Sequence, residues 1–171
     1  IRDRAHTIFP LAAKFTKEFC HLPESCEEIM AEWMDLSKDA YAHVTVKPGV
    51  RAYLKQCKAE GRRMAVVTSS VPIHCNTALE HLDLAKYFER ITFAQSLGLE
   101  KKGPEIWLRA AADAGVEPET CTMFDDSIAA CRGARLARMR TVGVYDSFFA
   151  ADEREMRSFC DAVSYTHLTL P

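Results

Sequence analysis

The sequence lacks a long apolar run, a large excess of either charge and any internal repeat. No stretch of its 171 residues approaches the roughly 20 consecutive apolar positions that a membrane-spanning helix needs. Lys and Arg number 22 and Asp and Glu 24, so the net charge of −2 gives no reason to expect nucleic acid or an anionic membrane as a partner. The composition is that of an ordinary globular protein, with 48% hydrophobic residues, and the length suits one domain with a small appendage.

Closely spaced cysteine pairs are also missing. The seven cysteines are odd in number and scattered, and none forms a C-x-x-C pair. This spacing argues against a disulfide framework or a structural zinc site. Together with the lack of a signal-peptide pattern in the first residues, it predicts a cytoplasmic protein whose cysteines are mostly small buried side chains.

Residues 1–46 carry helical patterns and no strand pattern. Leu11–Cys20 is amphipathic, and Ser25 followed by Glu28 is the capping-box signature of a helix N-terminus. The apolar residues that follow recur every three or four positions, which places them on one helix face: Ile29, Met30, Trp33, Met34 and Tyr41. We therefore expect a helical unit at this end of the chain.

Helices and strands alternate after Lys47-Pro48-Gly49. The patterns predict, in order, helix Val50–Glu60, strand Met64–Thr68, helix 72–84, strand Ile91–Ala94, helix Pro104–Ala114, strand Cys121–Phe124, helix Ser127–Ala137, strand Thr141–Tyr145 and helix Asp152–Ala162. The first strand is continuously apolar, which is typical of a strand buried on both faces. The alternation indicates βαβ units. The expected fold class is α/β, a Rossmann-like parallel sheet with helices on both faces.

The most informative segment is Cys121–Asp126, where an apolar run ends in two adjacent carboxylates and a helical pattern begins. Asp125 and Asp126 repel each other at such a position, and a hard divalent cation with oxygen ligands relieves that repulsion. The carboxyl end of a parallel strand is also where open α/β sheets place their active sites. The plain alternative is a turn followed by a helix cap at Ser127.

Two further groups of polar residues are expected at the same edge, because right-handed crossovers align the carboxyl ends of the strands. Thr68-Ser69 ends one strand, and Lys101-Lys102 precedes a helix. A hydroxyl that holds phosphate oxygens, a lysine that offsets their charge and acids that hold Mg²⁺ together suit phosphoryl transfer. Taken singly, Thr68 is a strand end and the lysines are solvated loop charges.

These motifs resemble those of the haloacid dehalogenase superfamily. Val66–Ser70 (V-V-T-S-S) is similar to its second motif. Lys101–Ile106 (K-K-G-P-E-I) is similar to the third, K-P-x-P-[DE]-[IV], and Met123–Ser127 (M-F-D-D-S) to the fourth, F-E-D-S. The similarity continues through Ala129–Val144 and covers about residues 24–160. The best match is the phosphoglycolate phosphatase and β-phosphoglucomutase-like branch, whose members carry a helical cap.

The resemblance implies which residues hold the phosphate. Thr68 would hydrogen-bond it, assisted by Ser69 or Ser70. Lys101 aligns with the lysine of the motif, and Lys102, at the usual proline position, is the fallback. The substitution of Pro-x by Lys102 and its following glycine is expected to loosen this loop.

The resemblance also implies a Mg²⁺ site and points to a missing motif. Asp126 would be the more direct Mg²⁺ ligand, with Asp125 in place of the commoner Glu. Family members carry D-x-D-x-[TV] on the first core strand, where one Asp is the nucleophile and the other the general acid/base. The 171 residues contain no such motif. In the family this strand lies between those that end here in Thr68 and Phe124, so the chain is expected to lack its nucleophile and middle strand, and to be poorly stable and inactive alone.

The family resemblance predicts a cap and a core, and the last eight residues, which do not continue the preceding helical pattern, are expected to form a third part. Residues 1–46 would be a partial helical cap, 47–163 the α/β core, and 164–171 (S-Y-T-H-L-T-L-P) a tail foreign to the native fold. Arg138 stands where the family usually has glycine, so the end of the preceding helix must accommodate a large side chain.

The expected function is Mg²⁺-dependent hydrolysis of a small phosphorylated metabolite through an aspartyl-phosphate. A cytoplasmic monomer or weak dimer that binds neither nucleic acid nor membrane is expected. A sugar-phosphate mutase is the alternative within this chemistry, because it differs only in the phosphoryl acceptor. A non-catalytic pseudo-enzyme or phosphate-binding module is the alternative outside it. A phospho-receiver domain is disfavoured, because there the acidic pair comes first in the chain and the lysine last.

Overall fold

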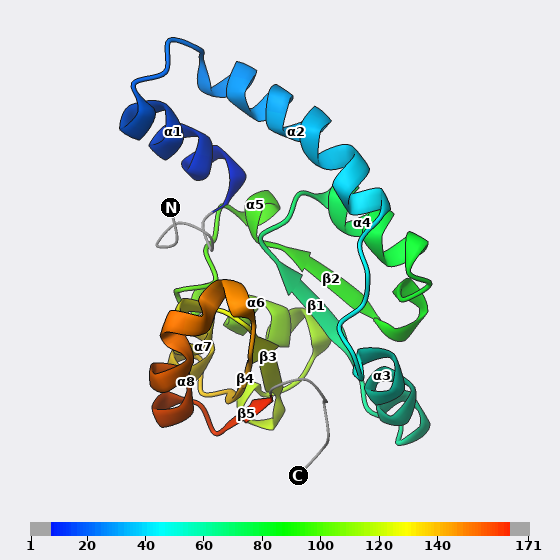
Figure 1. The fold of residues 1–171 in the computed structure, drawn as a ribbon. Coiled ribbons are helices and arrows are strands. Elements are labelled where there is room, and N and C mark those ends of the chain that lie inside the picture. The colour runs from blue at the N-terminus through cyan, green and yellow to red at the C-terminus, as the bar shows by residue number, and fades with distance from the viewer. Residues whose placement is uncertain (1–7, 165–171) are drawn as a thin grey trace.

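The structure, a computed structural model, describes residues 8–164 and consists of an N-terminal helical pair beside a mixed α/β part (Figure 1). The pair is α1 (Phe9–Cys20) and α2 (Cys26–Ala42), which pack against each other. The predicted capping box starts α2. Ser25 Oγ accepts from the Glu28 N–H at 3.2 Å, and the Glu28 carboxylate accepts from the Ser25 N–H at 2.7 Å.

The strands form two parallel sheets. The first pairs β1 (Ala65–Thr68) with β2 (Arg90–Phe93), and the second has the order β3 (Thr122–Asp125), β4 (Arg140–Val144) and β5 (Ala162–Ser164). Each of the four predicted strands lies within one residue of its expected bounds. Within residues 8–164 no strand pairs with both β1 and β3, so the sheets separate where the family resemblance places the strand that carries D-x-D-x-[TV].

Helices connect the strands and cover the sheets. The longer ones are α3 (Val50–Ala59), α4 (Pro72–His81), α6 (Glu105–Ala114), α7 (Ile128–Leu136) and α8 (Glu153–Phe159). The short ones are α5 (Ala94–Leu97) and the 3-10 turns η2 (Ala85–Tyr87), η3 (Pro118–Thr120) and η4 (Ser147–Asp152). In the core, α6 packs on β1, α7 on β3 and β4, and α8 on β5. The main core lies between α6, α7 and β3 and includes Ile106, Trp107, Met123 and Cys131.

Two sequence expectations are wrong in detail. The last helix does not reach Ala162, because Asp161 accepts hydrogen bonds from Thr141 N and Oγ1, at 2.7 and 3.1 Å, and this holds the chain beside β4 as strand β5. Ser164, the first residue of the expected tail, lies at the end of β5, and 165–171 are outside the described residues, so the expected tail stays a prediction. Strand β1 is half-buried rather than buried on both faces, because its edge toward β3 has no partner strand among residues 8–164.

Two aromatic rings pack across the separation between the sheets. Tyr53 of α3 meets Phe124 of β3 edge to face, with their ring centroids 5.5 Å apart. Burial, with Cys57 as a neighbour, raises the pKa of Tyr53 to about 12, and Phe124 remains 37% exposed. The contact between the β1 and β3 sides therefore depends partly on side chains rather than on a continuous sheet.

The described helices also bear on the relation to membranes. None of those within residues 8–164 combines the length and apolar character that crossing a bilayer requires.

Candidate functional site

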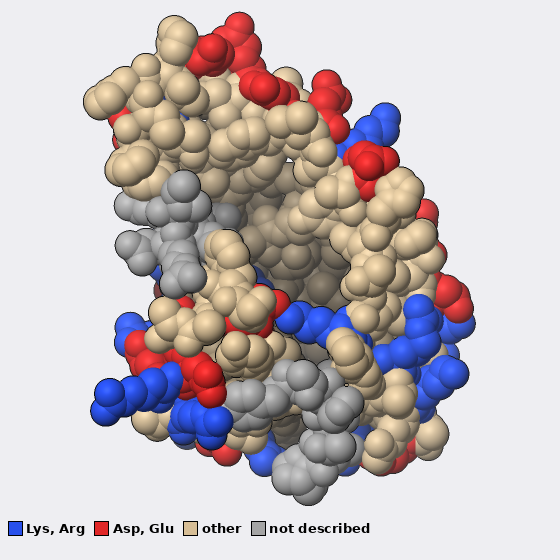
Figure 2. Space-filling view, in the orientation of Figure 1, with Lys and Arg blue, Asp and Glu red and all other residues tan. Residues whose placement is uncertain are grey.

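Two neighbouring cavities contain most of the polar residues singled out from the sequence. The smaller, of about 300 Å³, is lined by Ser69, Lys101, Asp125, Asp126 and Ser127, together with Ala130 and two phenylalanines of η4. The larger, of about 740 Å³, lies between the helical pair and the α/β part and includes Thr68, Ser69 and Ser70 in its lining. Ser69 lines both cavities, so they meet at the loop after β1. Figure 2 shows the hollow between the two parts of the molecule.

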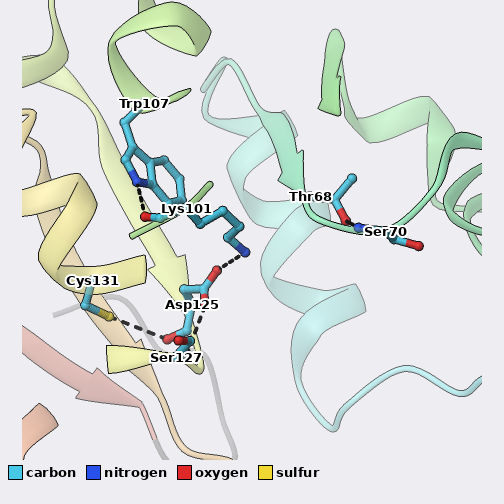
Figure 3. A network of polar contacts seen from close by, with 7 residues as sticks. All are labelled: Thr68, Ser70, Lys101, Trp107, Asp125, Ser127 and Cys131. Carbon is cyan, nitrogen blue, oxygen red and sulfur yellow. Dashed lines mark hydrogen bonds and ion pairs between the residues drawn. The ribbon is translucent and has the colours of Figure 1, made fainter. Parts of the chain in front are cut away.

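The central contact of the smaller cavity is an ion pair between Lys101 and Asp125. The Lys101 ammonium meets the Asp125 carboxylate, and the two side chains are 15% and 9% exposed (Figure 3). Because little water surrounds this pair, the attraction is screened much less than in a surface salt bridge. The two predicted residues, 24 positions apart in the chain, are therefore brought into direct contact at the carboxyl end of β3.

Trp107 positions Lys101 in two ways. Its indole N–H donates to the backbone carbonyl of Lys101 at 2.9 Å, and the Lys101 ammonium lies 5.9 Å from the centre of its ring. Trp107 is itself 4% exposed and anchored in the core on α6. The loop that the substitution of proline was expected to loosen is therefore held by an aromatic side chain.

Backbone and burial fix the two carboxylates differently. Asp125 Oδ1 accepts from the Ser127 N–H at 2.9 Å, a local turn that opens α7, whereas the Ser127 side chain makes no cap hydrogen bond. Asp125 therefore forms both the turn before the helix, which was the plain alternative to a site, and the ion pair with Lys101. Burial, and next the charge of Asp125, raise the pKa of Asp126.

The carboxylate pair fits the ligand chemistry of Mg²⁺. Within residues 8–164 no three His, Cys, Asp or Glu side chains gather into a complete metal site. Mg²⁺ in phosphoryl-transfer enzymes is commonly held by one or two carboxylates and completes its shell with waters and substrate phosphates. Asp125 and Asp126 are hard oxygen donors of this kind, next to a polar cavity. Both carboxylates line the smaller cavity, so they could hold such an ion there.

Thr68 and Ser70 lie apart from the ion pair and face the larger cavity. Thr68 Oγ1 accepts from the Ser70 N–H at 3.0 Å, which shapes the turn after β1 (Figure 3). The Ser70 hydroxyl donates to Tyr41 Oη of α2 at 3.3 Å. The residues expected to converge on one site are therefore divided between two cavities. The smaller cavity is lined by Ser69, Lys101, Asp125 and Asp126, whereas Thr68 and Ser70 line only the adjoining larger one.

Lys102, the fallback for the lysine role, does not enter either cavity. Its ammonium pairs with the Glu100 carboxylate at 2.6 Å, and its side chain is 51% exposed. Of the two adjacent lysines, Lys101 is the one placed toward Asp125.

The geometry of this edge, with a lysine and two acids after parallel strands, can be compared with known proteins. A family model described as haloacid dehalogenase-like hydrolase matches residues 11–138. The chain belongs to this family. The match includes the loop after β1, the Lys101 loop and the carboxyl end of β3, so the motif resemblance and the family assignment agree.

Relatives in the family act on phosphorylated compounds, as their names state. The chain is 32% identical over 123 residues to hexitol phosphatase B of Escherichia coli, covering 71% of this chain and 55% of that protein. It is 31% identical over 117 residues to phosphoglycolate phosphatase 1 of Pseudomonas aeruginosa, covering 68% and 43%. The chain thus spans about half the length of the curated relatives it matches.

The solved structures show the same fold. A β-phosphoglucomutase of Clostridium difficile superimposes with a TM-score of 0.83 at 20% identity, covering 99% of this chain and 75% of that one. A Thermotoga maritima protein described as a putative β-phosphoglucomutase gives a TM-score of 0.72 at 24% identity, covering 90% and 72%. The expected α/β fold of the family is confirmed.

Two supporting residues were missed by the sequence reasoning. Trp107 directly follows the Lys101–Ile106 motif, and its core packing rather than any motif ties it to the loop. Gly133 lies inside α7, and a Cβ atom there would overlap the Lys101 carbonyl oxygen and approach the Gly103 oxygen to 2.7 Å. A glycine in the middle of a helix was the available signal for a close backbone approach.

Proposed function

We propose that this chain is part of a Mg²⁺-dependent phosphatase that hydrolyses a small phosphorylated metabolite. The observation that carries the proposal is the buried contact between Lys101 and Asp125, in a cavity shared with Asp126 and Ser69. A preorganised cation beside carboxylates and a hydroxyl suits a phosphoryl group and its divalent ion. The named activities of the family relatives support the same reaction class.

Each residue would have a separate role in binding. The Lys101 ammonium would offset the charge on a phosphate oxygen, and Ser69 would donate a hydrogen bond from the neighbouring wall. The Thr68 hydroxyl oxygen accepts a hydrogen bond from the Ser70 N–H, so the hydroxyl hydrogen can be donated to the phosphate. Asp125 and Asp126 would hold Mg²⁺, which neutralises the charge of the transferring group when bound.

The nucleophile would come from outside the 171 residues. An aspartyl-phosphate needs a carboxylate of the D-x-D-x-[TV] type, which the sequence lacks. The separation between β1 and β3 offers a place for a strand that carries it. In this proposal α1 and α2 are part of a cap and residues 47–163 are the core, and the 171-residue chain alone binds phosphate without turning it over.

The coding sequence immediately upstream of Ile1 tests this proposal. An apolar strand that ends in D-x-D-x-[TV] supports it, and the longer protein should then release phosphate from a panel of metabolites only when Mg²⁺ is present. A start codon at the boundary would contradict it and favour a phosphate-binding module.

Calorimetry on the 171-residue chain provides a second test, carried out on the chain and on variants that a cooperative urea transition shows to be folded. Inorganic phosphate with Mg²⁺ should bind the wild type and Lys102→Met but not Lys101→Met, because Lys102 lines neither cavity. Equal binding by both variants would contradict the role given to Lys101.

A further inference from the structure

Among the described residues, the larger cavity is lined by apolar and polar residues without acidic or basic side chains of Asp, Glu, Lys or Arg. None of its described lining residues is Lys, Arg, Asp or Glu, in contrast to the smaller cavity, which contains all the charged groups of the site. In Figure 2 the walls of the hollow are mostly tan, with charged residues at its lower rim. Its volume of about 740 Å³ falls within the range of small-molecule sites.

Apolar side chains form the wall contributed by the helical pair. Phe9 of α1 and Trp33 of α2 pack edge to face, with their ring centroids 5.6 Å apart. Leu36, one turn further along α2, lines the same wall and is 70% exposed. When the apolar face of a ligand covers an aromatic and aliphatic surface that is open to solvent, both surfaces leave water, and this favours binding.

The polar groups of this cavity are hydroxyls and one imidazole, and they contact one another. Ser37 Oγ donates to the Trp33 carbonyl at 2.5 Å and lies 3.2 Å from His74 Nε2. The His74 ring stacks on Tyr41, with centroids 4.5 Å apart, and Tyr41 Oη in turn accepts from Ser70. Hydroxyls of this kind can bind other hydroxyls, but they do not supply the charge that a buried anion requires.

The two cavities meet at Ser69, which fixes how a phosphate ester would lie across them. Its phosphate belongs with Lys101 in the smaller cavity, and its alcohol would extend past Ser69 into the larger one. The wall formed by Trp33 and Leu36 therefore contacts the leaving group and not the phosphate.

We propose that the larger cavity selects phosphomonoesters whose alcohol is uncharged and has a ring-sized apolar face, and that it rejects esters with a second anionic group. The apolar face would lie on Trp33 and Leu36, while Ser37 and His74 would bind hydroxyls. This inference rests on the proposed function only for the position of the phosphate.

Calorimetric binding to the 171-residue chain tests the proposal without turnover. The affinities of inorganic phosphate, phenyl phosphate and 2-phosphoglycolate are measured in the presence of Mg²⁺. The pH is about 8, above the ordinary pKa range of an imidazole. Phenyl phosphate should bind at least about tenfold more tightly than 2-phosphoglycolate, because the carboxylate of 2-phosphoglycolate, its second anionic group, enters a cavity whose described lining has no Lys or Arg. Equal binding of the two esters beside normal phosphate binding would overturn the inference and leave the proposed function standing. No binding of any of the three by a chain that unfolds cooperatively in urea, and is therefore folded, would overturn both.

A charge introduced on the wall makes the test specific to α2. Leu36→Lys should raise the affinity for 2-phosphoglycolate and reduce or reverse the preference for phenyl phosphate. Leu136→Lys is the matched control, since Leu136 is 67% exposed on α7 and lines neither cavity. A preference that Leu36→Lys leaves unchanged would place the selectivity elsewhere and overturn the proposal.

Discussion

Gly133 in α7 lies directly against the backbone of Lys101, and this contact holds the lysine loop close to the end of β3. A Cβ atom on Gly133 would overlap the Lys101 carbonyl oxygen, the same oxygen that accepts from Trp107. The site lysine is thus placed by the absence of a side chain on one helix and by a ring on another.

Replacing Gly133 by alanine should displace the Lys101 loop. Helix propensity alone would favour alanine by about 1 kcal/mol, but overlap with backbone atoms that cannot rotate away costs about 1–3 kcal/mol. We therefore expect a lower free energy of unfolding in urea and weaker phosphate binding. Arg132→Ala introduces alanine at the preceding, exposed position of α7 and should leave phosphate binding unchanged. Normal phosphate affinity in Gly133→Ala would contradict this account of the loop.

Removing the Lys101 charge should cost far more stability than removing the charge of its neighbour. Lys101→Met leaves Asp125, 9% exposed, without its cation, and breaking a buried pair in this way costs about 3 kcal/mol. Lys102→Met breaks a pair whose lysine is 51% exposed, and the expected cost is below about 1 kcal/mol. Urea unfolding of both variants measures the difference, and similar losses would show that the Lys101 pair is effectively solvated.

Arg138→Gly should stabilise the chain. Arg138 follows α7 with φ 68°, a left-handed conformation that glycine adopts without steric cost. The expected gain in the free energy of unfolding is about 1 kcal/mol, since the ion pair lost with Glu119 is largely exposed. Arg138→Ala also removes the ion pair but keeps the strained backbone, so it should show no comparable gain. Equal stability of the two variants would contradict the conformational explanation.

Asp161→Asn should weaken the attachment of β5 in a pH-dependent way. Hydrogen bonds from Thr141, and the nearby Arg135, lower the pKa of Asp161 in the folded chain. A lowered folded-state pKa stabilises the protein above the unfolded value, about 3.9, and that contribution disappears as the pH falls through the folded value. At neutral pH the free energy of unfolding of the wild type should exceed that of the variant by about 1 kcal/mol. The difference is modest because Asp161 is partly exposed. Urea unfolding from neutral pH to below pH 4 should show the two curves converging, and a constant gap would contradict the assignment.

Local sequence patterns predicted the elements well, because each depends on neighbours in the chain. The Ser25 and Glu28 capping box, the apolar run of β1 and the acidic end of β3 all lie where the sequence indicates. The same patterns missed β5, since three residues carry too little periodicity, and it exists because Asp161 hydrogen-bonds to Thr141 of β4.

By itself, the sequence determined the α/β class, the family motifs and which residue types stand at the strand ends, because these follow from periodicity and from spacing along the chain. Only the tertiary structure decided that Lys101 and not Lys102 meets Asp125, and that Ser69 joins two cavities of different polarity. It also showed Gly133 and Trp107 supporting the lysine loop. These relationships join side chains from separate elements, and packing between elements, which no local pattern encodes, sets the distances between them.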